Sequence, residues 1–280
     1  MPRFAFQQVD VFTTEPLKGN PLAVVLGAEG LSDRQMADFA NWTNLSETTY
    51  LLKPTQAGAD YRVRIFTTER ELPFAGHPTL GSCHAWLGAG GSPRGAEVIQ
   101  ECGVGLVRIR RDGSRLAFAA PPLMRTGPVE PEVLAKIAKG LRIDPKTIAA
   151  SQWIDNGPGW VAVMLRTRAE VLALTPDIQA MAGLKLGVVA PWVAKTDGTE
   201  ANYEVRALIA GDVFKEDPVT GSLNAGLAQW LIGAGIAPTS YVASQGTVLG
   251  RAGRVHVTQA GADIWVGGHT VTCIEGAVTL

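Results

Sequence analysis

Two short segments of the sequence place the same residue types ahead of a helix-like run and suggest an anion-binding site. Residues 71–78 read ELPFAGHP and residues 216–223 read EDPVTGSL, so Glu, Pro and Gly recur at an offset of 145. Glycine lets the backbone approach a ligand closely, and the first N–H groups of a helix have no partner within it. Gly76 and Gly221, the second followed by Ser222, therefore predict two anion-binding helix starts.

The alternative is that these glycines only shape turns and that Ser222 only caps a helix. Either segment taken alone is explained in this way. The two segments share their context, however, because residues 61–66 (YRVRIF) and 203–208 (YEVRAL) precede them and alternate as half-buried strands do. As a pair near the pseudo-twofold axis of a duplicated fold, the segments favour a ligand site.

Two titratable side chains break the symmetry between the copies. His77 stands where the second copy has Ser222, and Asp217 stands where the first copy has Leu72. A repeat that only builds a core has no need of such differences. His77 is therefore predicted to act in acid–base chemistry or hydrogen bonding beside the anion site. Asp217 has the alternative of acting as an anion at a helix N-terminus.

Glu47 is a third candidate for chemistry. It lies within residues 44–52 (NLSETTYLL), after an expected helix and before an expected strand. A solvated loop glutamate is the ordinary explanation. The corresponding stretch of the second half, near residues 185–190, has no carboxylate, and this difference favours a site.

Each motif leads into a segment that is expected to be a buried helix. Residues 79–87 (TLGSCHAWL) and 223–231 (LNAGLAQWL) carry small or apolar residues on nearly every face. Strand-like runs recur before the motifs, and strand–turn–strand runs recur after them. The sequence therefore predicts an α+β fold of two pseudo-symmetric halves, each a β-barrel-like sheet around a central apolar helix.

Capping signals predict a further helix in each half. Ser32 with Gln35 forms a capping box for a helix over residues 33–42. Thr175, with Pro176 at the first helical position, predicts the equivalent helix of the second half.

The expected halves are residues 1–121 and 122–280, and the last strand, at about residues 271–280, is a candidate to cross back to the first half. A helix over residues 131–139, ended by Gly140, lies outside the repeat. Its single apolar face is typical of a surface helix.

The composition argues against several other classes of protein. Among 280 residues, 25 Lys and Arg balance 26 Asp and Glu, so neither nucleic acid nor an anionic membrane is an expected partner. We find no signal-peptide-like segment and no run of roughly 18 apolar residues, and we expect a cytoplasmic protein. The cysteines and histidines lack ligand spacing, so no metal site is expected and His84, His256 and His269 are assigned no role.

Four segments closely resemble the PhzF-like isomerases of phenazine biosynthesis. They are residues 45–49 (LSETT), 71–81 (ELPFAGHPTLG), 216–222 (EDPVTGS) and 244–246 (SQG), and the resemblance covers essentially the whole chain. It implies the diaminopimelate-epimerase fold, with the site between the two halves and commonly a homodimer. It also implies isomerisation of trans-2,3-dihydro-3-hydroxyanthranilate, the reaction of the best-understood members, without metal or organic cofactor.

The resemblance also implies roles for the candidate residues. Glu47 is the acid–base that moves a proton between ring carbons, and His77 and Asp217 hold the substrate and assist the transfer. The polar cradle for a small anionic substrate is formed by Gly76, Gly221 and Ser222.

Diaminopimelate epimerases use two cysteines as opposed bases, whereas His77 and Ser222 occupy those positions here. This difference favours one carboxylate that removes a proton and returns it on the same face of an already activated carbon acid. Such a mechanism requires that a dry pocket raise the pKa of Glu47. Leu223 and Asn224, where many relatives are expected to carry smaller residues, suggest a changed pocket shape. The alternatives are an epimerase of an amino-acid derivative and a small-acid-binding protein without chemistry.

Overall fold

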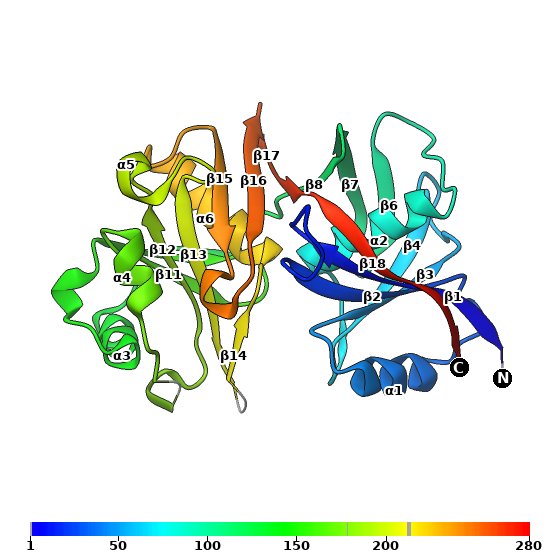
Figure 1. Ribbon diagram of the computed structural model, residues 1–280, viewed down its shortest axis with the longest axis horizontal. Coiled ribbons are helices and arrows are strands. Elements are labelled where there is room, and N and C mark those ends of the chain that lie inside the picture. Colours follow the sequence, from blue (N-terminus) through cyan, green and yellow to red (C-terminus); the bar gives the residue numbers. More distant parts are fainter. Residues whose placement is uncertain (1, 178, 212–213) are drawn as a thin grey trace. The chain divides into compact units, whose positions relative to one another are not determined.

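The computed structural model describes residues 2–177, 179–211 and 214–280 (Figure 1). The chain divides into two compact units. The first unit consists of Met1–Ala119 with Gly267–Leu280, and the second of Ala120–Val266. None of the helices in these described ranges is long and apolar enough to span a membrane.

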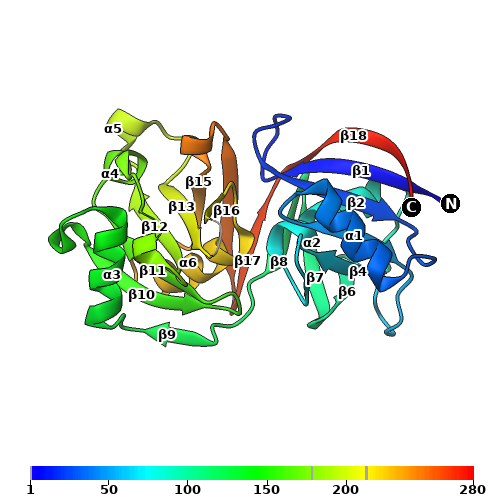
Figure 2. The same cartoon turned by 90° about the horizontal axis from the view of Figure 1, so that it is seen from below.

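The first unit contains both ends of the chain. Its elements are β1 (Arg3–Val11), β2 (Asn20–Leu26), α1 (Asp33–Thr43), β3 (Thr48–Leu52), β4 (Tyr61–Phe66), β5 (Glu71–Leu72), α2 (Gly76–Gly88), β6 (Val98–Cys102), β7 (Gly105–Asp112), β8 (Arg115–Ala119) and β18 (Thr270–Thr279). The last strand, β18, runs antiparallel to β1, and the two lie side by side in Figures 1 and 2.

The second unit is a continuous stretch of chain. Its main elements are β9 (Arg125–Gly127), α3 (Pro131–Leu141), β10 (Ala150–Asp155), β11 (Trp160–Met164), α4 (Arg168–Ala173), β12 (Lys185–Pro191), α5 (Ala194–Asp197), β13 (Tyr203–Ala210), β14 (Phe214–Asp217), α6 (Gly221–Gly233), β15 (Ser240–Gln245), β16 (Gly253–Ala260) and β17 (Asp263–Gly268), whose end passes into the first unit.

The strands of the two units pair by the same scheme. In the first unit β2 is parallel to β3, β3 is antiparallel to β4, and β4 is antiparallel to β5 and parallel to β6. In the second unit β11, β12, β13, β14 and β15 repeat these pairings in the same order. The strands β18 and β9 also correspond, because each lies antiparallel to the first long strand of its unit. The two units therefore share one scheme of strand pairing.

The two apolar helices begin at the predicted starts, Gly76 and Gly221. Helix α2 spans Gly76–Gly88 and α6 spans Gly221–Gly233, each 13 residues long, and the interior of both is largely buried. Gly81 and Gly226 lie at the same position in the two helices. A Cβ at Gly81 would lie 2.6 Å from Leu22 Cδ2, and one at Gly226 would lie 2.5 Å from the carbonyl oxygen of Ile154. The absence of a side chain therefore lets each helix pack closely on its sheet.

Gly226→Ala is expected to lower the free energy of unfolding by about 1–3 kcal/mol, because the added methyl overlaps a backbone atom that cannot rotate away. Urea denaturation measures the effect. Gly233→Ala, at the end of the same helix, is the matched control, since no atom lies within 4 Å of its Cβ position. Equal midpoints for the two variants would contradict the proposed reason for this glycine.

The capping box of α1 is confirmed: Ser32 accepts a hydrogen bond from the Gln35 N–H, and the Gln35 side chain binds the Ser32 backbone. Its predicted counterpart at Thr175 and Pro176 is wrong. The second unit instead starts α4 with a capping box of Thr167 and Glu170. A reciprocal pair of side-chain bonds satisfies two backbone N–H groups, whereas proline at the first position only removes one.

The predicted end of α3 at Gly140 is also wrong. The helix continues to Leu141 and is closed by Arg142, whose φ of 58° is left-handed. Gly140 is instead a packing residue, because a Cβ there would lie 1.9 Å from Cγ of Met181. A glycine near a helix end therefore has two explanations that local sequence does not separate.

Candidate active site

In the first unit, Glu47 and His77 come together from segments far apart in the sequence. Helix α1 is closed by Asn44 in a left-handed conformation with φ of 54°, and Glu47 then directly precedes β3. His77 is the second residue of α2. Oε2 of Glu47 lies 3.3 Å from Nε2 of His77, and their side chains are 16% and 5% exposed. The solvated-loop explanation for Glu47 therefore does not fit.

Burial controls the protonation of His77. It lowers the pKa of this side chain to about 3 because water no longer stabilises the imidazolium. His77 is therefore neutral at neutral pH. Its Nε2 makes no hydrogen bond among the described residues, although Oε2 of Glu47 is close. A buried polar atom in this state is suited to a ligand atom that supplies the missing partner.

Asn20 is a neighbour of His77 that the motifs did not indicate. It is the first residue of β2, is fully buried, and places Nδ2 3.4 Å from Nδ1 of His77. The preceding Gly19 donates its N–H to Oδ2 of Asp10 over 2.9 Å. The available signal for Asn20 in the sequence was a single amide side chain at the first position of an otherwise apolar strand.

In the second unit, Asp217 and Ser222 lie on either side of the start of α6. Asp217 ends β14, and its Oδ2 accepts a hydrogen bond from the Thr220 hydroxyl over 2.6 Å. Ser222 is the second residue of the helix, and its Oγ accepts a hydrogen bond from Nε1 of Trp160 over 3.0 Å. Both polar side chains are thus held by neighbours from the same unit.

Neither helix start is capped by a side chain. Gly76 and Gly221 are the first residues of α2 and α6, and both are buried. The N-cap positions fall to Ala75 and Thr220, and neither makes a side-chain capping bond. The alternative that Ser222 is an N-cap is therefore wrong. Backbone N–H groups at the first turn remain available to an anion at each start.

Gln245 explains why the segment SQG accompanies the second motif. Its Oε1 accepts hydrogen bonds from the Thr220 N–H and from Nδ2 of Asn224, over 3.1 and 2.8 Å. Its Nε2 donates to the Thr220 hydroxyl over 3.0 Å. The related pair in the first unit is Gln100 and Thr79, joined at 3.0 Å. Gln245 and Asn224 lie 145 residues after Gln100 and Thr79, which is the same offset as between the two motifs. This repeat was the available signal in the sequence.

Leu223 and Asn224 lie inside the second unit. Both are fully buried, Leu223 lies where a Cβ on Gly187 would meet it, and Asn224 binds Gln245. The expectation that these residues change the shape of a substrate pocket is therefore not supported.

The cysteines do not contribute a reactive thiol to either helix start. Cys83 lies in α2 and Cys102 ends β6, and both are buried. Burial raises the pKa of Cys83 to about 12, so its thiol is protonated at neutral pH. Across residues 2–177, 179–211 and 214–280, no group of three or more His, Cys, Asp and Glu side chains has the arrangement of a metal site.

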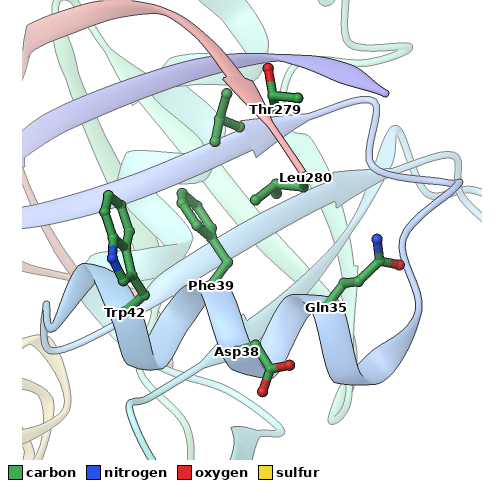
Figure 3. Close-up of a pocket in the computed structure, with 7 residues that line it drawn as sticks. Gln35, Asp38, Phe39, Trp42, Thr279 and Leu280 are labelled. Carbon is green, nitrogen blue, oxygen red and sulfur yellow. The ribbon is translucent and has the colours of Figure 1, made fainter. Parts of the chain in front are cut away.

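A pocket of about 400 Å³ lies elsewhere on the first unit, beside α1. Phe39 and Trp42 project from α1 toward Leu280 and Thr279, the last residue of β18, whereas Asp38 points away (Figure 3). None of the candidate residues lines this pocket. It is therefore separate from the chemistry that Glu47 and His77 suggest.

Comparison with known proteins agrees with the motifs. A model of the family described as phenazine biosynthesis-like protein (PhzC-PhzF) matches residues 9–276. The chain belongs to this family. Its α+β, diaminopimelate-epimerase-like fold is confirmed by solved structures. One of them, a phenazine biosynthesis protein of the PhzF family from Enterococcus faecalis, has a TM-score of 0.82 and 24% identity and covers 100% of both chains.

Relatives in this family include proteins from a yeast and a bacterium. Antisense-enhancing sequence 1 of Schizosaccharomyces pombe is 34% identical over 99% of both chains. The trans-2,3-dihydro-3-hydroxyanthranilate isomerase of Pseudomonas aeruginosa is 32% identical over 95% of this chain and 92% of its own. Further relatives that cover most of this chain are also named isomerases. The chain is an isomerase.

Proposed function

We propose that the chain shifts a proton between two carbons of a small unsaturated or cyclic acid, with Glu47 as the single acid–base and no cofactor. The observation that carries this proposal is the contact of 3.3 Å between the Glu47 carboxylate and the buried His77, at a helix start without a side-chain cap. A carboxylate that moves protons needs shelter from water and a polar neighbour that holds its geometry.

In the proposed reaction, the Glu47 carboxylate removes a proton from a carbon that is acidified by conjugation. The negative charge spreads over the conjugated system of the substrate. The carboxyl group of Glu47 then returns the proton to another carbon on the same face. Because His77 is neutral, it acts through a hydrogen bond rather than as a cation.

The remaining candidate residues are proposed to bind the substrate. The first-turn N–H groups of α2 and α6, which begin at Gly76 and Gly221, would bind carboxylate oxygens. Asp217 and Ser222, at the start of α6, would hold polar groups of a substrate. Because a relative with 32% identity is named trans-2,3-dihydro-3-hydroxyanthranilate isomerase, a small acid of that kind is the first candidate substrate.

We also propose a homodimer, which sedimentation equilibrium would test.

Incubation of candidate acids in deuterated water tests the proposed function. A positional shift with deuterium at the new carbon supports it. Inverted configuration at one carbon would instead support an epimerase, an activity that the fold of this family also suits. Tight binding without exchange would support a binding protein and contradict the proposal.

A further inference from the structure

The side chains at the two helix starts are each contacted by a donor that begins the corresponding strand of its unit. Asn20 is the first residue of β2, and its Nδ2 lies 3.4 Å from Nδ1 of His77. Trp160 is the first residue of β11, and its Nε1 lies 3.0 Å from Oγ of Ser222. The strands β2 and β11 correspond, because each is antiparallel to the preceding strand and parallel to the following one.

In the first unit this contact determines which nitrogen of His77 carries the proton. A neutral imidazole has one N–H and one acceptor nitrogen. With the Asn20 amide nitrogen as donor, Nδ1 is the acceptor and the proton resides on Nε2. Nε2 is also the atom that lies 3.3 Å from Oε2 of Glu47. The opposite tautomer would direct a lone pair at the carboxylate.

In the second unit the same logic applies to a hydroxyl. The indole N–H of Trp160 can only donate, so Oγ of Ser222 accepts this bond. The hydroxyl hydrogen of Ser222 is then left to donate to another acceptor. Trp160 is 2% exposed and its ring is fixed by the core, so the direction of the bond is fixed too.

We propose that Asn20 and Trp160 are positioning residues that make His77 and Ser222 hydrogen-bond donors toward the substrate. This inference rests on the proposed function for its consequence in catalysis. It also deepens that function, because a hydrogen-bond donor beside a helix N-terminus, as at His77 and at Ser222, selects acceptor oxygens such as those of a carboxylate or an enolate.

The tautomer of His77 is measured by long-range ¹H–¹⁵N NMR of the full chain. The His77→Gln variant assigns the spectrum, because the signal that it lacks is the signal of His77. We expect a proton on Nε2 alone in the wild type. In Asn20→Asp the new carboxylate accepts from the ring, so Nδ1 gains a proton. Gln100→Glu, the same kind of change at a buried position bonded to Thr79 and Tyr61, should leave the wild-type pattern.

A proton on Nδ1 in the wild type, or an unchanged pattern in Asn20→Asp, would overturn the inference. If Asn20→Asp does not fold, Asn20→Ala replaces it, and loss of the donor should give a mixture of both tautomers. This readout needs no substrate. The tautomer assignment can therefore fail while the proposed function holds. The proposed function can likewise fail in the exchange experiment while the tautomer assignment holds.

Steady-state kinetics on an acid that shows exchange test the second unit. Trp160→Phe keeps an aromatic side chain but removes the indole N–H, so we expect KM to rise by about fivefold, the value of one ordinary hydrogen bond, with a smaller change in kcat. Trp153→Phe is the matched control, because that indole donates to Glu130 over 2.8 Å instead. Equal kinetic effects of the two changes would overturn the role of Trp160.

Discussion

Glu47→Gln is expected to lower kcat on the order of a thousandfold, because the amide cannot take or return a proton while its size and shape are kept. Glu47 makes the close contact with His77, and its side chain is 16% exposed, so the change should alter chemistry more than folding. The rate of deuterium incorporation into the substrate in deuterated water measures the proton-transfer step directly.

Glu71→Gln is the control for this variant. Glu71 opens the first motif, but its carboxylate forms a salt bridge of 2.7 Å with Arg64. A change there should leave the exchange rate within a few-fold of the wild type. If Glu47→Gln retains the wild-type exchange rate, Glu47 is not the acid–base and the proposed mechanism fails.

His77 is expected to make the stability of the protein depend on pH. Burial lowers the pKa of His77 in the folded state to about 3, whereas the side chain in the unfolded chain keeps its ordinary value of 6.5. Between these values the unfolded state binds the proton and the folded state does not. Acidification through this window therefore favours unfolding, by about 1.4 kcal/mol for each pH unit. Above pH 6.5 and below pH 3 the contribution of His77 does not change further.

The measurement compares the wild type with His77→Gln by urea denaturation at several pH values from 7 to 4. Other titrating groups contribute to both proteins and cancel in the difference. The free-energy advantage of the wild type over the variant should shrink as the pH falls below 6.5. Parallel pH profiles would show that His77 titrates normally and is not buried as described.

The sequence predicted the parts of the fold that depend on local chemistry and on repetition. The starts of α2 and α6 at Gly76 and Gly221 are correct because the same motif, followed by an apolar run, occurs at both. The capping box at Ser32 is correct because it is a bond between near neighbours. The helix expected at Thr175 is wrong, because the capping box of the second unit is formed by Thr167 and Glu170 and the helix that it starts ends at Ala173.

The site was predicted only in part. Glu47 and His77 were identified by their difference from the second copy, and the structure places them 3.3 Å apart. The motifs did not indicate Asn20, Trp160 and Gln245, because each of these residues contacts a partner that is distant in the sequence. The separations are 57 residues to His77, 62 to Ser222 and 25 to Thr220. Such contacts depend on which strands pair and in which register, and no single segment of sequence carries that information.

The pairing of β1 with β18 has a consequence for how the protein is made. A ribosome synthesises β1 before β18, yet β18 is one of the two strands that pair with β1. The second unit, a continuous stretch, can fold before β18 is synthesised, whereas the first unit keeps an open strand edge until β18 is made. An open edge invites pairing with other chains. In the nascent polypeptide, the edge of β1 is therefore expected to be open to pairing with other chains until the ten residues of β18 emerge.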